Sequence, residues 1–156
     1  MLDAIAVWLD AAGLRAFAGG DNYPWINSVH LLGLVMLVGA IGVVDLRIAG
    51  VWRGLPMAAL SRALTPLAIT GLVILVASGS LLFAADGVAL ARSDIFVRKL
   101  VLIAFALANA AAFQLIWTPR MEGWGDVAPT PARIMAAASV LLWLMVSLQG
   151  RLIAYS

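Results

Sequence analysis

The chain has 156 residues, of which 64% are hydrophobic and 12% are charged, and its formal net charge is +2. A soluble domain carries about a quarter charged residues, and the mean hydropathy here is +1.05. These values exclude a disordered chain, a nucleic-acid-binding protein built on a basic surface, and almost any soluble enzyme. The absence of cysteine and the single histidine exclude disulfides, thiolate chemistry and a multi-histidine metal site within one chain. We therefore expect an integral membrane protein that contacts the lipid bilayer and binds no nucleic acid.

Residues 1–20 predict a short amphipathic helix followed by a turn. Apolar residues that share one arc of a helical wheel are Leu2, Ile5, Trp8, Leu9, Ala12 and Ala16. Asp3 and Asp10 lie together outside this arc. Because no basic residue precedes the apolar stretch and two aspartates interrupt it, a cleaved signal peptide is disfavoured. We expect a helix on the membrane surface or across the end of a bundle.

Four later runs contain no Asp, Glu, Lys or Arg and together make up about half the chain: 26–44, 63–85, 100–119 and 134–150. A helix needs about 20 apolar residues to cross the hydrocarbon. Lipid cannot solvate open backbone groups, and continuous apolarity does not fit the alternating strands of a barrel. We predict an all-α membrane protein, a four-transmembrane-helix bundle over 21–156, with spans at about 26–46, 65–85, 98–118 and 131–151.

Local signals place the helix ends. Thr65-Pro66 and Thr130-Pro131 each resemble an N-cap followed by proline at the first helical position, which predicts the starts of the second and fourth spans. Thr118-Pro119 predicts the end of the third span.

The distribution of basic residues predicts the orientation. With the N-terminus outside, the inner connections hold Arg47, Arg53, Arg62, Arg120 and Arg133, and the outer side holds Arg15, Arg92, Arg98, Lys99 and Arg151. The two totals are equal, so the flanks of the first span decide. One arginine precedes that span and three follow it. We predict that the N-terminus lies outside.

Several segments resemble an uncharacterised family of small bacterial inner-membrane proteins, known as a domain of unknown function. They are Pro24-Trp25, Val29-His30-Leu31-Leu32-Gly33, the run from Val44 to Gly50, the run from Asp94 to Leu100, Asn109-Ala110, and the ending that begins Gly150-Arg151-Leu152. The resemblance implies a four-span bundle in the bacterial inner (cytoplasmic) membrane and brings no activity with it. Where it leads us to expect a histidine, this chain has Gln114. A fainter similarity, to the membrane domain of copper-resistance D-type proteins, rests on a histidine-glycine span ending in Asp-Leu-Arg.

His30 is the first candidate for a binding site, because a polar group within the membrane is costly and is often functional. It lies about five residues below the outer end of its span. An imidazole there could ligate haem b or a metal, bind a quinone or pass a proton. The alternative is a hydrogen bond to a carbonyl or a serine of a neighbouring helix that fixes the packing.

A haem with two histidine ligands needs more than one chain. Residue 114 falls near the far end of the third span, which runs parallel to the first, so it differs from His30 in depth by roughly 15 Å. Even a histidine at 114 could not share an iron with His30 in one subunit. Such a site would need two copies of His30 in a homo-oligomer, or a methionine or an open position as second ligand.

Polar residues at the inner side predict a second cluster, made of Asp45, Arg47, Arg62, Asn109, Gln114 and Arg133. Asp45 and Arg47 are too close in sequence to face one another on a helix, so we expect Asp45 to pair with Arg62 or Arg133. Asn109 should donate a hydrogen bond to a neighbouring helix. The cluster either fixes helix register or binds a headgroup, a quinone or a partner.

At the outer side, Arg98 and Lys99 open the third span, and Gln149 and Arg151 close the fourth. Long basic side chains at helix ends usually extend to phosphate headgroups. If these residues converge on His30 instead, they form a polar vestibule.

Three functions remain open. The favoured one is a redox-associated subunit that binds haem b or quinone near His30. The others are a cofactor-free accessory or scaffold subunit of a larger membrane complex, and a small-solute or proton conduit. No catalytic motif is recognised, so the sequence does not decide whether the protein is an enzyme.

Overall fold

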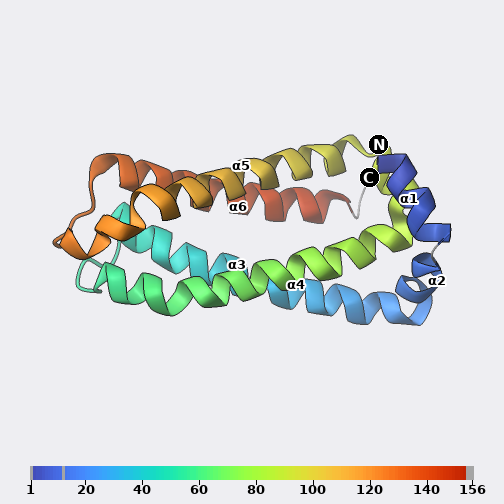
Figure 1. Cartoon of the computed structure of the whole chain (residues 1–156), viewed down its shortest axis with the longest axis horizontal. Helices are drawn as coiled ribbons and strands as arrows, with labels where there is room; N and C mark the ends of the chain where they lie inside the picture. Colours follow the sequence, from blue (N-terminus) through green and yellow to red (C-terminus); the bar gives the residue numbers. More distant parts are fainter. Residues whose placement is uncertain (1, 12, 154–156) are drawn as a thin grey trace.

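A computed structural model describes residues 2–11 and 13–153. Its elements are α1 (Leu2–Ala11), α2 (Leu14–Ala18), the 3₁₀ helix η1 (Gly20–Asn22), α3 (Tyr23–Ala49), α4 (Met57–Ala91), α5 (Asp94–Ile116), the 3₁₀ helix η2 (Thr118–Gly123) and α6 (Thr130–Leu152). The last three residues of the expected bundle region, 154–156, lie outside the described part, as do residues 1 and 12. The described chain is therefore helical throughout, with short connections (Figure 1).

The prediction of four membrane helices is confirmed. α3, α4, α5 and α6 are each long and apolar enough to cross a membrane. They run up and down in sequence order, and their long axes lie side by side (Figure 1). We call the end that carries α1 and α2 the amino end and the other end the loop end. The protein is an all-α, multi-pass membrane protein.

α3 and α4 form the closest pair in the bundle, because two glycines let their backbones touch. A Cβ atom on Gly33 would lie 2.9 Å from the carbonyl oxygen of Gly71. A Cβ atom on Gly71 would lie 2.7 Å from the backbone nitrogen of Leu37 and 2.8 Å from the carbonyl oxygen of Gly33. Small residues permit such approach in membranes, where no hydrophobic force drives helices together.

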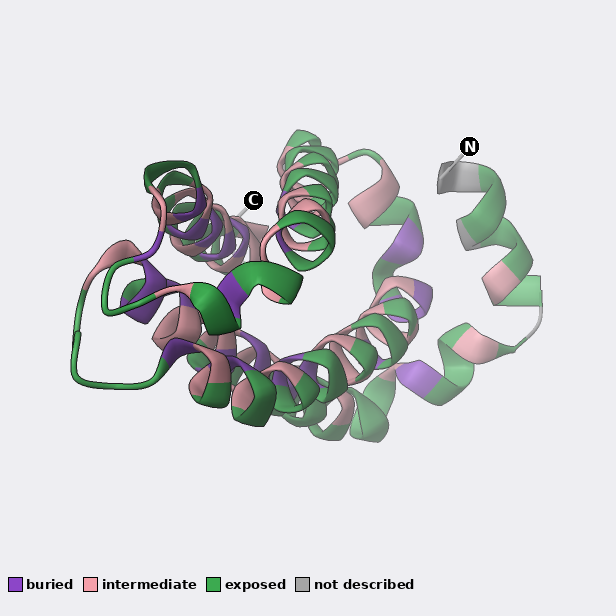
Figure 2. Cartoon of the chain, turned by 60° about the vertical axis from the view of Figure 1, so that its left-hand side comes forward, coloured by how far each residue is buried: buried purple, intermediate pink, exposed green. Residues whose placement is uncertain are grey.

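The other helices close only part of a ring. α6 packs on both α5 and α3, whereas α4 and α5 scarcely contact one another. In the view that brings the loop end forward, the α5–α6 pair lies apart from α4 on one side of the bundle (Figure 2). The order around the bundle is therefore α4, α3, α6, α5, with an open side between α4 and α5.

The N-terminal segment is not one helix. Gly13, with φ 74°, separates α1 from α2, and both helices pack against α4. Glycine adopts this left-handed conformation without strain, so two helices stand within residues 1–20, where one was expected. α1 lies across the amino end of the bundle (Figure 1), and its Trp8 side chain is 66% exposed. The expectation of an amphipathic end helix therefore holds for residues 2–11, with Ala12 outside the described part.

The predicted start of the second span is wrong, and that of the fourth span is displaced by one residue. α4 begins at Met57, directly after Pro56, so Pro66 lies inside the helix and Thr65 is no cap. Proline is tolerated within membrane helices because neighbouring groups satisfy the freed carbonyl. In α6, Pro129 takes the capping position and Thr130 makes no side-chain cap. The third span does end before Thr118, as predicted.

Candidate functional site

A cavity with a volume of about 420 Å³ lies between the four long helices. We call it the interhelical pocket. Its polar lining consists of Asp45, Ser61, Thr65, Asn109, Gln114, Ser139 and Trp143, and most of its remaining wall is aliphatic. The pocket occupies the half of the bundle nearer the loop end and borders the open side between α4 and α5. Its size falls in the range of small-molecule sites.

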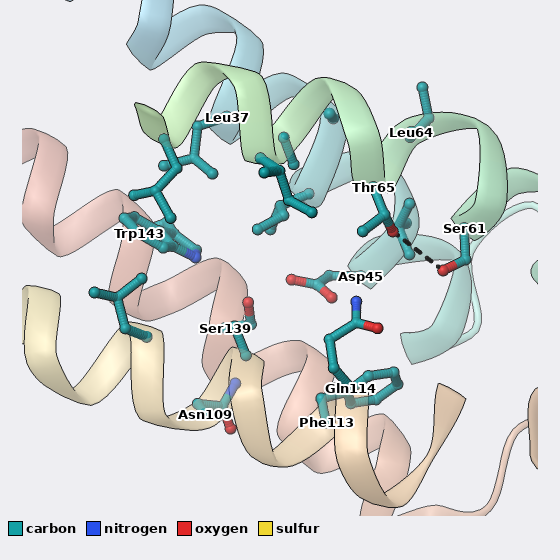
Figure 3. A pocket seen from close by; sticks show the side chains of 18 of the residues that line it. Leu37, Asp45, Ser61, Leu64, Thr65, Asn109, Phe113, Gln114, Ser139 and Trp143 are labelled. Atoms are coloured by element: carbon teal, nitrogen blue, oxygen red, sulfur yellow. Dashed lines mark hydrogen bonds between the residues drawn. The ribbon is translucent and has the colours of Figure 1, made fainter. Parts of the chain in front are cut away.

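Asp45 presents a carboxyl group to this pocket from the last turns of α3. Its side chain is 8% exposed, and its Oδ2 atom has no hydrogen-bond partner among the described residues. The hydroxyl group of Ser139, on α6, faces the carboxyl group and can donate to it (Figure 3). A buried polar atom without a partner costs about 1–3 kcal/mol. Oδ2 is therefore open to a hydrogen bond from a bound molecule.

Trp143 presents the second unpartnered group. Its side chain is 3% exposed, and its indole Nε1 has no hydrogen-bond partner among the described residues. The indole nitrogen points toward the space that Asp45 also faces (Figure 3). Trp143 follows Ser139 by one helical turn, a rise of about 6 Å. The pocket thus has an open acceptor and an open donor at neighbouring depths.

Gln114 lies across the pocket from Asp45. The Thr118 hydroxyl group donates to Gln114 Oε1 at 3.0 Å. This bond turns the amide nitrogen of Gln114 toward the carboxyl group of Asp45 (Figure 3). No hydrogen bond joins the two side chains in the described structure, so the amide leaves donors for a ligand.

Asn109 uses its amide to hold α5 on α6. Its Nδ2 atom donates to the carbonyl oxygen of Met135 at 3.1 Å. The predicted hydrogen bond from Asn109 to a neighbouring helix is confirmed.

The predicted ion pair of Asp45 is wrong. Arg62 extends outward and pairs with Glu122 of η2, and both side chains are mostly exposed. Arg133 donates from Nε to the carbonyl oxygen of Ala49 at 3.2 Å. Each arginine lies near the end of its helix and reaches toward the loop end, away from the pocket. The predicted cluster therefore divides: Asp45, Asn109 and Gln114 line the pocket, and the arginines hold the loop end.

Arg47 is the buried arginine of that loop end, 2% exposed. Its guanidinium group donates to the carbonyl oxygens of Leu55 at 2.6 Å, Arg53 at 2.8 Å and Asp126 at 3.3 Å. It thereby joins the connection after α3 to the connection before α6. Its role in the structure is to fix these loops, since no carboxyl group is among its described partners.

His30 lies near the amino end and does not line the interhelical pocket. Its Nδ1 atom is 2.9 Å from the hydroxyl oxygen of Ser78 on α4. The expected packing bond to a serine of a neighbouring helix is confirmed. Ser78 itself donates to the carbonyl oxygen of Ile74 at 2.6 Å. Because that bond uses the only hydroxyl proton, Nδ1 of His30 is the donor and Nε2 carries the free lone pair.

The residues of the expected outer vestibule gather only in part. Lys99 lies close enough to His30 for electrostatic interaction, and a Cβ atom on Gly150 would be 3.3 Å from its Nζ atom. Arg98 donates to the carbonyl oxygen of Asp94 on its own helix. Gln149 and Arg151 lie in the last turn of α6, at the same end. Lys99 therefore approaches His30.

Sequence reasoning missed Trp143 as a site residue. The available signal was a tryptophan far from either membrane interface, where the indole N–H has no water to bind. Ser61 and Thr65 were missed as well, because the expected second span began at residue 65. A longer α4 brings both hydroxyl groups to the pocket, where their oxygens lie 3.4 Å apart (Figure 3).

Comparison with known proteins gives a family and no activity. No curated protein and no solved structure matches the chain significantly, so the similarity to copper-resistance proteins gains no support. Within the described residues, no group of three or more histidine, cysteine or acidic side chains could hold a metal ion. The model of the Family of unknown function (DUF6644) matches residues 9–156. The chain, whose own four long helices position the pocket described above, belongs to this family.

Proposed function

We propose that the protein is a redox-associated membrane protein that binds a lipid-soluble quinone in the interhelical pocket. One observation carries the proposal: Asp45 Oδ2 and Trp143 Nε1 are both buried without partners and face the same cavity. A quinone head is a flat ring with oxygens on opposite sides. One oxygen accepts from the indole N–H, and the other accepts from the Gln114 amide nitrogen beside Asp45. The isoprenoid tail of such a ligand suits the aliphatic wall.

The open side between α4 and α5 supports entry from the bilayer. Both helices cross the hydrocarbon, and apolar side chains beside the opening are exposed, among them Ile69 at 56% and Leu107 at 37%. A ligand using this route must dissolve in lipid. This condition favours a quinone over a water-soluble metabolite or ion, and it disfavours the solute-conduit hypothesis.

The proposed quinone site differs from the one that the sequence suggested. Asp45 follows His30 by 15 residues on α3, a rise of about 22 Å. The pocket walls come from Asp45 and its neighbours, and His30 is not among them. We therefore assign quinone binding to the Asp45 region.

Titration with a short-tailed benzoquinone tests the proposal. Purified protein in detergent is titrated with decylbenzoquinone, and binding is followed by calorimetry against an empty-micelle blank. We expect saturable binding, weakened about tenfold in Trp143→Phe, because this change removes a hydrogen bond from the indole N–H to a ligand oxygen. Ser80→Ala is the control: Ser80 is exposed on α4, donates to the Val76 carbonyl oxygen and lies outside the pocket. The absence of saturable binding would reject the proposal and favour the scaffold function.

A second candidate, haem b at His30, is favoured by the Ser78 contact. Metal-ligating histidines usually donate their other ring N–H to an acceptor, and His30 donates from Nδ1 to Ser78. The chain offers one imidazole, so it would supply one axial ligand, and a second copy in a homo-oligomer would supply the other. Visible spectra of oxidised and reduced protein test this candidate. A haem band lost in His30→Ala and kept in Asp45→Asn supports it, and a colourless wild-type protein rejects it.

We also infer a bacterial inner-membrane location with the N-terminus outside. The support is the charge around α3, with Arg15 before it and Arg47, Arg53 and Arg62 after it. Because the chain has no cysteine, single cysteines report the orientation directly. With a membrane-impermeant maleimide on intact spheroplasts, Arg92→Cys should react and Gly54→Cys should not. The reverse pattern would invert the assigned orientation.

A further inference from the structure

We infer that the interhelical pocket selects the reduced, hydroquinone form of its ligand, through Asp45 and the two donors beside it. The inference rests on the proposed quinone function and adds which redox form is bound. It depends on the number of hydrogen-bond donors and acceptors that the pocket leaves open, and on where they lie.

Asp45 is the open acceptor. Ser139 satisfies part of its carboxyl group, and Oδ2 is left without a partner. No lysine, arginine or histidine is among the described residues that line the pocket. The sequence predicted Arg62 or Arg133 as the partner of Asp45, but both arginines bind other groups at the loop end. Oδ2 is therefore available to accept a hydrogen bond from a ligand.

Two open donors flank this acceptor. Trp143 Nε1 is an N–H group that can only donate. The amide nitrogen of Gln114 faces the pocket as a donor, because its Oε1 atom accepts from Thr118. Figure 3 shows both nitrogens directed toward the space beside Asp45. A group bound between Gln114 and Asp45 must accept from the amide and donate to the carboxyl group at once.

A hydroxyl group meets that requirement and a carbonyl group does not. Each hydroxyl of a hydroquinone donates one hydrogen bond and accepts others. One hydroxyl can donate to Asp45 while it accepts from Gln114, and the opposite oxygen can accept from Trp143. A quinone offers two acceptors and no donor, so it satisfies Trp143 and Gln114 but leaves Asp45 Oδ2 without an incoming hydrogen bond. A site built for a ligand hydroxyl rejects the analogue that lacks it.

The test compares the two redox forms of one ligand. Decylbenzoquinone and decylhydroquinone are titrated anaerobically into the purified protein at one pH. We expect the hydroquinone to bind about tenfold more tightly, the factor that one additional hydrogen bond to a charged or strongly polar group supplies. The dimethyl ether of decylhydroquinone, which has no hydroxyl proton, should bind no more tightly than the quinone.

Two variants separate the sources of the preference. Asp45→Asn replaces an acceptor oxygen by an NH₂ donor of similar shape, and we expect the ratio of the two affinities to fall to about one. Trp143→Phe removes a donor that both forms use, so both affinities should fall while their ratio is kept.

The outcomes distinguish this inference from the function on which it rests. If neither form binds, the proposed function fails and the inference fails with it. If both forms bind equally to the wild type, or if the dimethyl ether matches the hydroquinone, the inference is overturned and quinone binding stands.

Discussion

On one side of α4, the backbone of Gly71 touches the backbone of α3, and on the other side α4 leaves α5 almost untouched. Both surfaces belong to one helix that crosses the same bilayer. The first contact excludes even a Cβ atom, whereas the second borders a cavity of about 420 Å³. Close contact in a membrane comes from small residues and van der Waals packing. The bundle therefore consists of a tightly joined α3–α4 pair and an α5–α6 pair, held together through α3 and α6 with the pocket between them.

The largest effect is expected when the tight contact is broken. Leucine at position 71 would place Cβ 2.7 Å from the Leu37 nitrogen, so α3 and α4 must move apart. Overpacking of this kind costs about 3 kcal/mol. Gly71→Leu should therefore lower the thermal midpoint in detergent, measured by circular dichroism, by about 6–12 °C for a domain of this size.

Gly39→Ala is the matched control for this contact. Gly39 also lies within α3, but a Cβ atom there would meet nothing within 4 Å. Its thermal midpoint should stay close to that of the wild type. If Gly71→Leu melts like Gly39→Ala, the close α3–α4 contact is refuted.

The second-largest loss of stability is expected when the hydrogen bonds at the loop end are removed. Arg47→Met keeps most of the volume of a buried side chain but removes the donors to Leu55, Arg53 and Asp126. Hydrogen bonds from a charged group contribute about 1.5–3 kcal/mol each where they cannot be replaced. Because water can replace some of these, we expect a net loss of about 2 kcal/mol and faster proteolysis within residues 50–56 and 124–129.

Arg53→Met separates this effect from simple loss of charge. The Arg53 side chain is exposed, and Arg47 uses only its backbone carbonyl. That variant should match the wild type in both stability and proteolysis. Equal proteolysis of Arg47→Met and Arg53→Met would show that the guanidinium group does not hold the loops.

The four membrane helices could be predicted from the sequence, but the partner of Asp45 and the start of α4 could not. Long uncharged runs must form helices in lipid, so the positions of these runs in the sequence predicted the four spans. The partner of Asp45 did not follow, because the direction of Arg62 and Arg133 depends on loop carbonyls and on η2, which no spacing rule supplies. The start of α4 was misplaced because Thr65-Pro66 has the same local pattern as a true cap. Only the earlier Pro56 marks the actual beginning.

The orientation of Gln114 was likewise beyond the sequence. Its position on α5 could be predicted to within a turn. The choice of which end of the amide faces the pocket depends on Thr118, one turn further along the chain. The contact of Asn109 with α6 was predictable, since a deep amide must find a partner and the fourth span was the next helix.

A smaller effect is expected from the link between α5 and α6. Asn109→Leu removes the hydrogen bond to the Met135 carbonyl oxygen. Interhelical hydrogen bonds in membranes average about 0.6 kcal/mol, so the free energy of unfolding should fall by about 1 kcal/mol or less. Asn27→Leu, at an exposed asparagine of α3, is the control. An Asn109→Leu midpoint equal to that of the control would argue against the interhelical role.

The smallest effect on stability should come from adding bulk on the open side. Ala110 of α5 lines the interhelical pocket, so leucine at this position extends into a space that is already present. We expect Ala110→Leu to change the free energy of unfolding by no more than about 0.5 kcal/mol, against about 3 kcal/mol for Gly71→Leu. The same variant should weaken decylbenzoquinone binding, because it fills part of the cavity that the ligand occupies. If Ala110→Leu unfolds as readily as Gly71→Leu, α4 and α5 are more tightly packed than described, and the pocket loses its route from the bilayer.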